Sequence, residues 1–146
     1  MNNLNETSDR YRQVQVETAS TVDLVVLAYE ALIRNLYQAL ESLEEGPNSY
    51  GVFSDKLTRC QEIVSALDDG IDDSQGELST MLTDLYQFVR SNLIESNLNK
   101  DAEGVQTLIS TLEQVKGYWE DSNRLSQTEV ALEDLSEEKE KIDIAT

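Results

Sequence analysis

The sequence predicts an all-α protein: an antiparallel up-and-down four-helix bundle with a flexible N-terminal segment and an acidic C-terminal tail. Apolar residues recur every three or four positions in four separate segments, as they do on amphipathic helices. Helix-breaking stretches separate these segments, and the alternation typical of strands is absent from the sequence. Helices of similar length that are joined by short connections pack most simply as an up-and-down bundle.

The first helix is predicted over residues 21–44 and carries apolar residues on two sides. A broad stripe should face the core. It comprises Val22, Val25, Val26, Tyr29, Leu32, Ile33 and Leu36, and continues through Tyr37, Leu40 and Leu43. Leu24, Leu27, Ala28 and Ala31 fall on roughly the opposite side, where an amphipathic helix usually carries charge. We therefore expect something to cover this second apolar group.

The second and third helices are predicted over residues 50–69 and 75–97. EGPN at residues 45–48 precedes the second, and Ser74 and Glu77 have the spacing of a capping box at the start of the third. The second helix is one-sided, with core positions at Phe53, Leu57, Cys60, Val64 and Leu67. The third should present Leu78, Met81, Leu82, Leu85, Val89 and Leu93, with Tyr86 and Phe88 on the two edges of the stripe and Ile94 and Leu98 outside it.

The fourth helix is predicted to begin after a short break at NKD, residues 99–101, where Asp101 can cap it, and the bundle is predicted to end at about residue 121. Its core face comprises Val105, Leu108, Ile109, Leu112, Val115 and Trp119. We therefore expect an N-terminal segment over residues 1–19, the four-helix bundle over residues 20–121 and an acidic tail over residues 122–146. Residues 130–135 have the spacing of a short fifth helix, but the following EEKEK run favours a solvated, frayed end.

The composition excludes several classes of function. The formal net charge is −18, from 11 Lys and Arg against 29 Asp and Glu, so nucleic acids and anionic membranes would be repelled. No apolar run approaches the roughly 20 residues that span a bilayer. The N-terminus lacks the basic and then apolar regions of a signal peptide. We expect a cytoplasmic protein that binds no nucleic acid and does not insert into a membrane.

The sequence offers few of the groups that catalysis needs. It contains no histidine, which removes the commonest general base and the Glu-x-x-His ligand sets of helical di-iron sites. DDGIDD at residues 68–73 lacks the order of an EF-hand loop and is predicted to be a solvated turn. Cys60 lies among apolar residues at helical spacing, so we expect a buried thiol rather than a nucleophile. We predict no catalytic residue, no metal site and no cofactor.

Two explanations remain open for the second apolar side of the first helix. The chain itself could cover it, for example through Tyr11, Val14 and Val16, which directly precede the helix. A partner could also cover it, because contiguous apolar patches mark interaction sites more often than single exposed residues do. The two combine if the N-terminal segment covers the surface until a partner displaces it.

Several motifs resemble those of the flagellar export chaperone FliS family, in matching order and spacing over residues 11–121. The N-terminal match comprises Tyr11, Val16, Thr18-Ala19-Ser20, Leu24, Leu27, Tyr29-Glu30 and Leu32-Ile33. The third helix adds residues 85–89 and 93–101, and Trp119 stands where the family has a tryptophan. The departures are Thr21 in place of proline, Ala28 in place of leucine, Ala31 in place of glycine and Ser96 in place of alanine.

This resemblance implies a cytosolic helical-bundle chaperone without enzymatic activity. Such a chaperone binds the C-terminal segment of newly made flagellin, prevents its premature polymerisation and helps to deliver it to the flagellar type III export apparatus. The client-binding residues expected here are Leu24, Leu27, Ala31, Ile94 and Leu98. Tyr11, Val14 and Val16 are the candidates for the displaceable N-terminal cover.

Two other classes of function stay open at this stage. One is a helical adaptor or regulatory protein for a different client, which would use the same exposed surface but bind no flagellin. The other is a bundle enzyme with a metal site built from carboxylates alone, which the lack of histidine disfavours.

Overall fold

The computed structural model describes the backbone of residues 21–145 and the side chains of residues 21–125 except Gln75. Within the described backbone there are four α-helices and no strand: α2 (Thr21–Glu44), α3 (Tyr50–Asp69), α4 (Glu77–Asn99) and α5 (Ala102–Ala145). Two short 3-10 helices, η1 (Pro47–Ser49) and η2 (Asp73–Gln75), stand before α3 and α4. The all-α four-helix bundle predicted from the sequence is confirmed.

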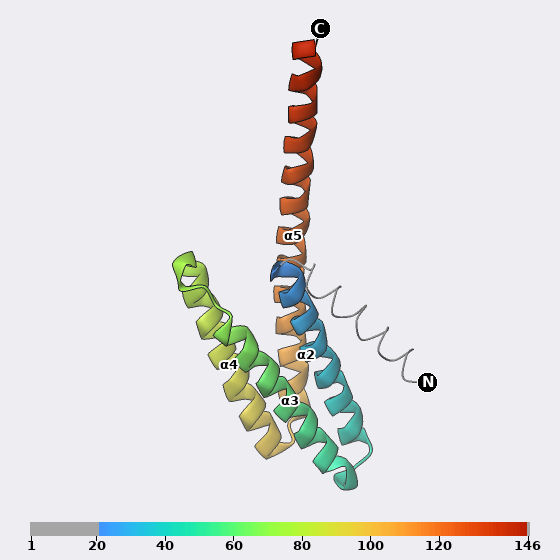
Figure 1. Ribbon diagram of the computed structural model, residues 1–146. Coiled ribbons are helices and arrows are strands. Elements are labelled where there is room, and N and C mark those ends of the chain that lie inside the picture. Colours follow the sequence, from blue (N-terminus) through green and yellow to red (C-terminus); the bar gives the residue numbers. More distant parts are fainter. Residues whose placement is uncertain (1–20, 146) are drawn as a thin grey trace, which may run out of the picture. The chain divides into compact units, whose positions relative to one another are not determined.

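The chain divides between Leu24 and Val25 and again between Lys116 and Gly117. The segment Val25–Lys116 is one compact unit, called here the central unit, and it contains α3, α4, most of α2 and the start of α5. In Figure 1 consecutive helices of the central unit run in opposite directions. In the other unit, Asn123 Nδ2 donates to Asp23 Oδ1 at 2.6 Å.

Local sequence explains where the helices begin and end. After α2, Gly46 has a φ of 95°, a conformation that favours glycine, and Pro47 then occupies the first position of η1. Lys100, between α4 and α5, has left-handed backbone angles (φ 50°, ψ 49°) and ends α4. The observed bounds of α2 and α3 are those predicted.

Two local predictions at the helix ends are wrong. Ser74 does not cap α4, because it lies in η2, where its backbone N–H donates to Asp72 Oδ1 at 3.0 Å; α4 instead begins after Gly76. The fourth helix also does not end near residue 121, since α5 continues to Ala145. After Gly117 its sequence contains no glycine or proline and is rich in good helix formers, so nothing interrupts it. The division of the chain at residues 19 and 121 stays a prediction.

The core of the central unit is apolar and draws on all four helices. Its buried hydrophobic side chains are Tyr29, Leu32, Ile33, Leu36, Ala39, Phe53, Leu57, Cys60, Ile63, Val64, Tyr86, Val89, Leu93, Val105, Leu108, Ile109 and Leu112. Most of these positions are the predicted core faces. Val115, and Trp119 in the other unit, are only half-buried.

One polar contact crosses the middle of this core. The hydroxyl oxygens of Tyr29 on α2 and Tyr86 on α4 are 3.0 Å apart in a buried hydrogen bond. Burial raises the pKa of Tyr86 strongly, and the neighbouring Tyr29 adds to the shift. A buried hydroxyl needs a hydrogen-bond partner, so this pair lets two large phenol rings fill the core.

Polar contacts join α3 to α4 near both ends of α3. Arg90 of α4 pairs with Asp68 near the end of α3. At the other end Ser54 donates to Asn97 Oδ1 at 2.8 Å, and the Lys100 ammonium donates to both side chains. Lys100 Nζ also lies 5.2 Å from the centre of the Phe53 ring. These contacts set the side of α4 that faces α3.

The structure corrects the predicted faces of α4 and α2. Tyr86, expected at an edge, is 2% exposed, whereas Leu78 and Met81, expected in the core, are 44% and 67% exposed. The hydroxyl of the buried Ser79 donates a hydrogen bond to the Asp72 carbonyl. This bond and the contact of Arg90 with Asp68 orient α4 so that the side carrying Tyr86 faces the core. Tyr37, expected on the core stripe of α2, is also exposed. Its hydroxyl donates to Glu113 Oε1 on α5 at 3.1 Å, so the side chain lies at the surface rather than in the core.

Adjacent residues of α4 allow a direct test of the core. Leu93 is fully buried and Ile94 is half exposed. We expect Leu93→Ala to lower the free energy of unfolding by about 2–5 kcal/mol and Ile94→Ala by less than about 1 kcal/mol, because only the first leaves a cavity. Denaturant titration followed by circular dichroism measures both values. Equal losses would show that the face of α4 is assigned incorrectly.

The thiol of Cys60 is predicted to be unreactive in the folded protein. Its Sγ lies 3.7 Å from the Leu32 carbonyl oxygen, and burial raises its pKa to about 12. Because the thiolate is the reactive form, alkylation at pH 8 should be slower by on the order of 1,000-fold than in the unfolded chain.

Raising the pH should also destabilise wild type more than Cys60→Ala. The raised pKa means that Cys60 favours folding below its unfolded pKa of about 8.5, and this contribution is lost as the pH rises towards 12. Alkylation monitored by mass spectrometry and urea titrations at several pH values test both expectations. Equal alkylation rates in buffer and in denaturant would contradict the burial of the thiol.

Candidate functional site

The described residues contain neither an obvious metal centre nor a membrane span. Among them no three His, Cys, Asp or Glu side chains are grouped so that they could hold a metal ion. Likewise, none of the helices in the described part of the chain combines the length and apolarity of a membrane-spanning segment. Exposed apolar side chains on α2 and α4 form the candidate site.

The outer face of α2 carries the first group of exposed apolar residues. Leu24 is 40% exposed and Leu27 is 51% exposed, and Ala31 is half-buried. At about 100° per residue, Leu27 lies about 180° around the helix from the fully buried Leu36. Leu24 belongs to the other unit, whereas Leu27 and Ala31 belong to the central unit. The structure thus leaves the second apolar side of α2 open at Leu27.

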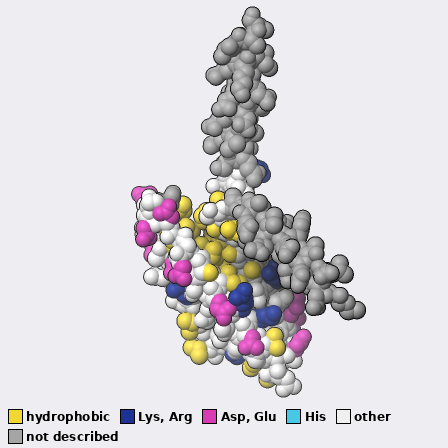
Figure 2. All heavy atoms as spheres, viewed as in Figure 1, with side chains coloured by type: hydrophobic (Ala, Val, Ile, Leu, Met, Phe, Trp, Pro, Cys, Tyr) yellow, Lys and Arg dark blue, Asp and Glu magenta, His cyan; other side chains and the backbone are white. Residues whose placement is uncertain are grey.

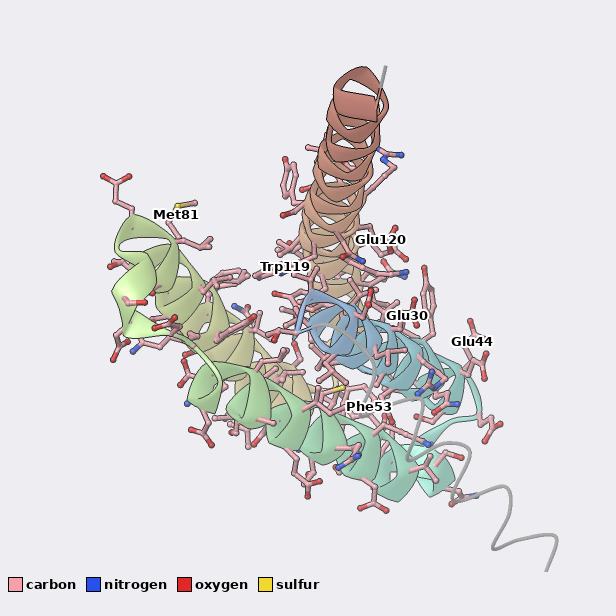
Figure 3. All side chains as sticks on the ribbon, turned by 45° about the horizontal axis from the view of Figure 1, so that its top comes forward. Glu30, Glu44, Phe53, Met81, Trp119 and Glu120 are labelled. Atoms are coloured by element: carbon pink, nitrogen blue, oxygen red, sulfur yellow. The ribbon has the colours of Figure 1, made fainter. Side chains whose placement is uncertain are left out.

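Polar contacts with α5 hold α2 along one edge within the central unit. Lys116 Nζ lies 3.8 Å from Glu30 Oε1, and Tyr37 donates to Glu113 as described above. The hydrogen bond to the Glu113 carboxylate, and its charge, raise the pKa of Tyr37. Figure 3 labels Glu30 on the side of α2 that is near α5. Glu30 and Tyr37 are seven residues apart and therefore share one edge of the helix.

A second group of exposed apolar residues lies on the second half of α4. Ile94 is 50% exposed and Leu98 is 78% exposed. The neighbouring Asn97 and Lys100 bind α3, so this part of α4 is fixed in place while Ile94 and Leu98 stay accessible. That the α2 and α4 groups act together on one client stays a prediction. The proposed cover residues Tyr11, Val14 and Val16 lie outside the described residues.

Sequence reasoning missed the exposed apolar residues on the first half of α4. Leu78 and Met81 have the spacing of a core stripe, and Phe88 was placed at its edge, yet all three are exposed. Their spacing alone does not distinguish a core face from an interaction face. The signal was the acidic pair Glu77 and Asp84, whose seven-residue spacing places a charged row along the same side.

These observations describe a helical bundle with exposed apolar side chains on α2 and α4. The family described as "Flagellar protein FliS" matches residues 3–126. The flagellar secretion chaperone FliS of Salmonella typhimurium strain LT2 is 27% identical over 115 residues, which cover 75% of this chain and 84% of the relative.

The chain belongs to the FliS family. The family and the Salmonella relative together support a flagellar export chaperone, and FliS is a family of chaperones rather than of enzymes. Such a chaperone implies a secretion substrate as its partner. The exposed apolar residues are candidates for contact with that substrate.

The outer face of α2 should tolerate a charge. Because Leu27 is half exposed, we expect Leu27→Asp to change the free energy of unfolding by no more than about 1 kcal/mol, whereas Leu32→Asp, at a fully buried position, should prevent folding. Thermal melts followed by circular dichroism measure the difference. If Leu27→Asp unfolds the protein as Leu32→Asp does, Leu27 is part of the core and not of a binding surface.

Proposed function

We propose that this protein is a cytoplasmic chaperone that binds the C-terminal segment of flagellin. By occupying that segment it prevents premature polymerisation and helps to deliver the subunit to the flagellar type III export apparatus. Membership of the FliS family supports the chaperone class. The observation that carries the assignment of a surface is the exposure of Leu27 on the side of α2 opposite its buried face.

The exposed apolar residues suit a helical client. An amphipathic helix binds another protein through apolar anchors at every third or fourth position, and Leu24, Leu27 and Ala31 offer contacts at that spacing. Ile94 and Leu98 would extend the contact along a second helix. A client segment that orders only on binding loses part of its binding energy to that ordering, so an extended contact is expected.

The charge of the chaperone supports the same role. A net charge of −18 keeps chaperone molecules apart while an apolar client segment is masked. We further propose that Tyr11, Val14 and Val16 cover the α2 surface until the client displaces them. Under this proposal residues 1–19 act as the cover, residues 20–121 as the binding bundle and residues 122–146 as an acidic extension.

Calorimetric titration with flagellin of the same organism tests the proposal. We expect full-length flagellin to bind and flagellin without its C-terminal segment not to bind. Leu27→Asp should weaken binding by at least about tenfold, because it places a charge in a buried apolar contact. The matched control is Gln106→Asp, which adds the same charge at an exposed position of α5.

The outcomes separate the client from the surface. If neither form of flagellin binds, the flagellin assignment is wrong, and a helical adaptor for another client becomes the leading interpretation. If full-length flagellin binds but Leu27→Asp and Gln106→Asp behave alike, flagellin is the client and the surface on α2 is wrong. Deletion of residues 1–19 should tighten binding if that segment covers the surface.

A further inference from the structure

The first half of α4 displays an apolar surface that is separate from Ile94 and Leu98 and that the proposed client contacts do not use. Leu78, Met81 and Phe88 are 44%, 67% and 49% exposed, and Leu82 and Leu85 beside them are half-buried. These five residues, called here the α4 stripe, recur every three or four positions along about three turns of helix. Figure 3 shows Met81 projecting from the start of α4 away from α3.

The opposite side of α4 is engaged by the rest of the central unit. Ser79 bonds the Asp72 carbonyl, Arg90 pairs with Asp68, and Tyr86 is buried against Tyr29. At about 100° per residue, Met81 and Phe88 lie about 160–180° around the helix from Arg90. The helix is thus held on its α3 and core sides while the α4 stripe stays accessible on a rigid element.

Acidic residues run beside the α4 stripe. Glu77 and Asp84 are exposed and seven residues apart. Met81 lies between them in the sequence, and Phe88 lies about one turn after Asp84. All residues of α4 are described, and Arg90 is the one basic residue among them. Its guanidinium is paired with Asp68. Figure 2 shows acidic side chains at the end of the bundle where α3 ends and α4 begins, with a hydrophobic area beside them.

We propose that the α4 stripe is a second docking surface, for an amphipathic helix of another protein that carries Lys or Arg along one edge of its apolar face. The apolar residues of such a helix would pack on Met81 and Phe88, and its basic edge would lie along Glu77 and Asp84. Complementary charge of this kind directs partner choice and register. The surface is distinct from Leu27 on α2 and does not depend on flagellin being the client.

The charge pattern argues against the other occupants of an apolar stripe. A second copy of this chain would bring its own Glu77 and Asp84 to the contact, and like charges placed together oppose association. An anionic membrane would be repelled by the same two carboxylates. A basic amphipathic helix is the occupant that both the apolar and the acidic residues favour.

Two synthetic peptides provide the probe. Both are amphipathic helices with the same apolar face, and they differ only in carrying Lys or Glu along its edge. Fluorescence anisotropy should show the Lys peptide binding at least about tenfold more tightly at low salt, with the advantage shrinking at high salt. Met81→Asp should weaken the Lys peptide by at least about tenfold, and Leu27→Asp should leave its affinity unchanged.

Matched charge reversals separate a local effect from the overall negative charge. Asp84→Lys and Glu103→Lys alter the net charge equally, but Glu103 is an exposed residue of α5. Asp84→Lys should lower the affinity for the Lys peptide at least about threefold more than Glu103→Lys does, and it should improve binding of the Glu peptide. Equal effects of the two reversals would overturn the proposal.

Further outcomes would also overturn it. These are a lack of binding by both peptides, equal binding of both, or a loss on Leu27→Asp that matches the loss on Met81→Asp. A wild-type dimer that Met81→Asp converts to a monomer, seen by analytical ultracentrifugation, would assign the surface to a second copy. Circular dichroism melts establish that each variant is folded, as expected for substitutions at exposed positions.

Discussion

The four helices carry more apolar side chains than one core can bury, and the excess side chains form exposed apolar surfaces. Each helix of the central unit contributes a buried face, yet Leu27 on α2 and Met81 on α4 are left at the surface. Exposed apolar area costs free energy in water and favours association. A protein that retains such area on rigid helices has surfaces ready for other proteins.

Polar contacts determine which apolar faces are left over. The Tyr29–Tyr86 hydrogen bond places α4 with Tyr86 inward, and the pairing of Arg90 with Asp68 sets its rotation against α3. These contacts are specific in direction, whereas apolar packing alone tolerates several rotations of a helix. A few hydrogen bonds therefore decide that Tyr86 fills the core and Met81 does not.

Charge distinguishes the two exposed surfaces. Leu27 and Ala31 lie on α2, whose acidic Glu30 is near Lys116 of α5. Met81 and Phe88 instead lie beside Glu77 and Asp84, which have no basic neighbour on the same edge of α4. Electrostatic complementarity contributes more to partner choice than to affinity. Two apolar surfaces on one protein can in this way select different partners.

The sequence by itself determined the class of fold, the bounds of α2 and α3, the buried thiol of Cys60 and the exposed apolar side of α2. These depend on periodicity and on helix breakers, which are local properties of the chain. Only the tertiary structure decided the rotation of α4, because Tyr86 and Leu78 both have the spacing of core residues. Which of the two is buried depends on the contacts of α4 with Tyr29, Asp68 and Asp72, and these three residues lie outside α4.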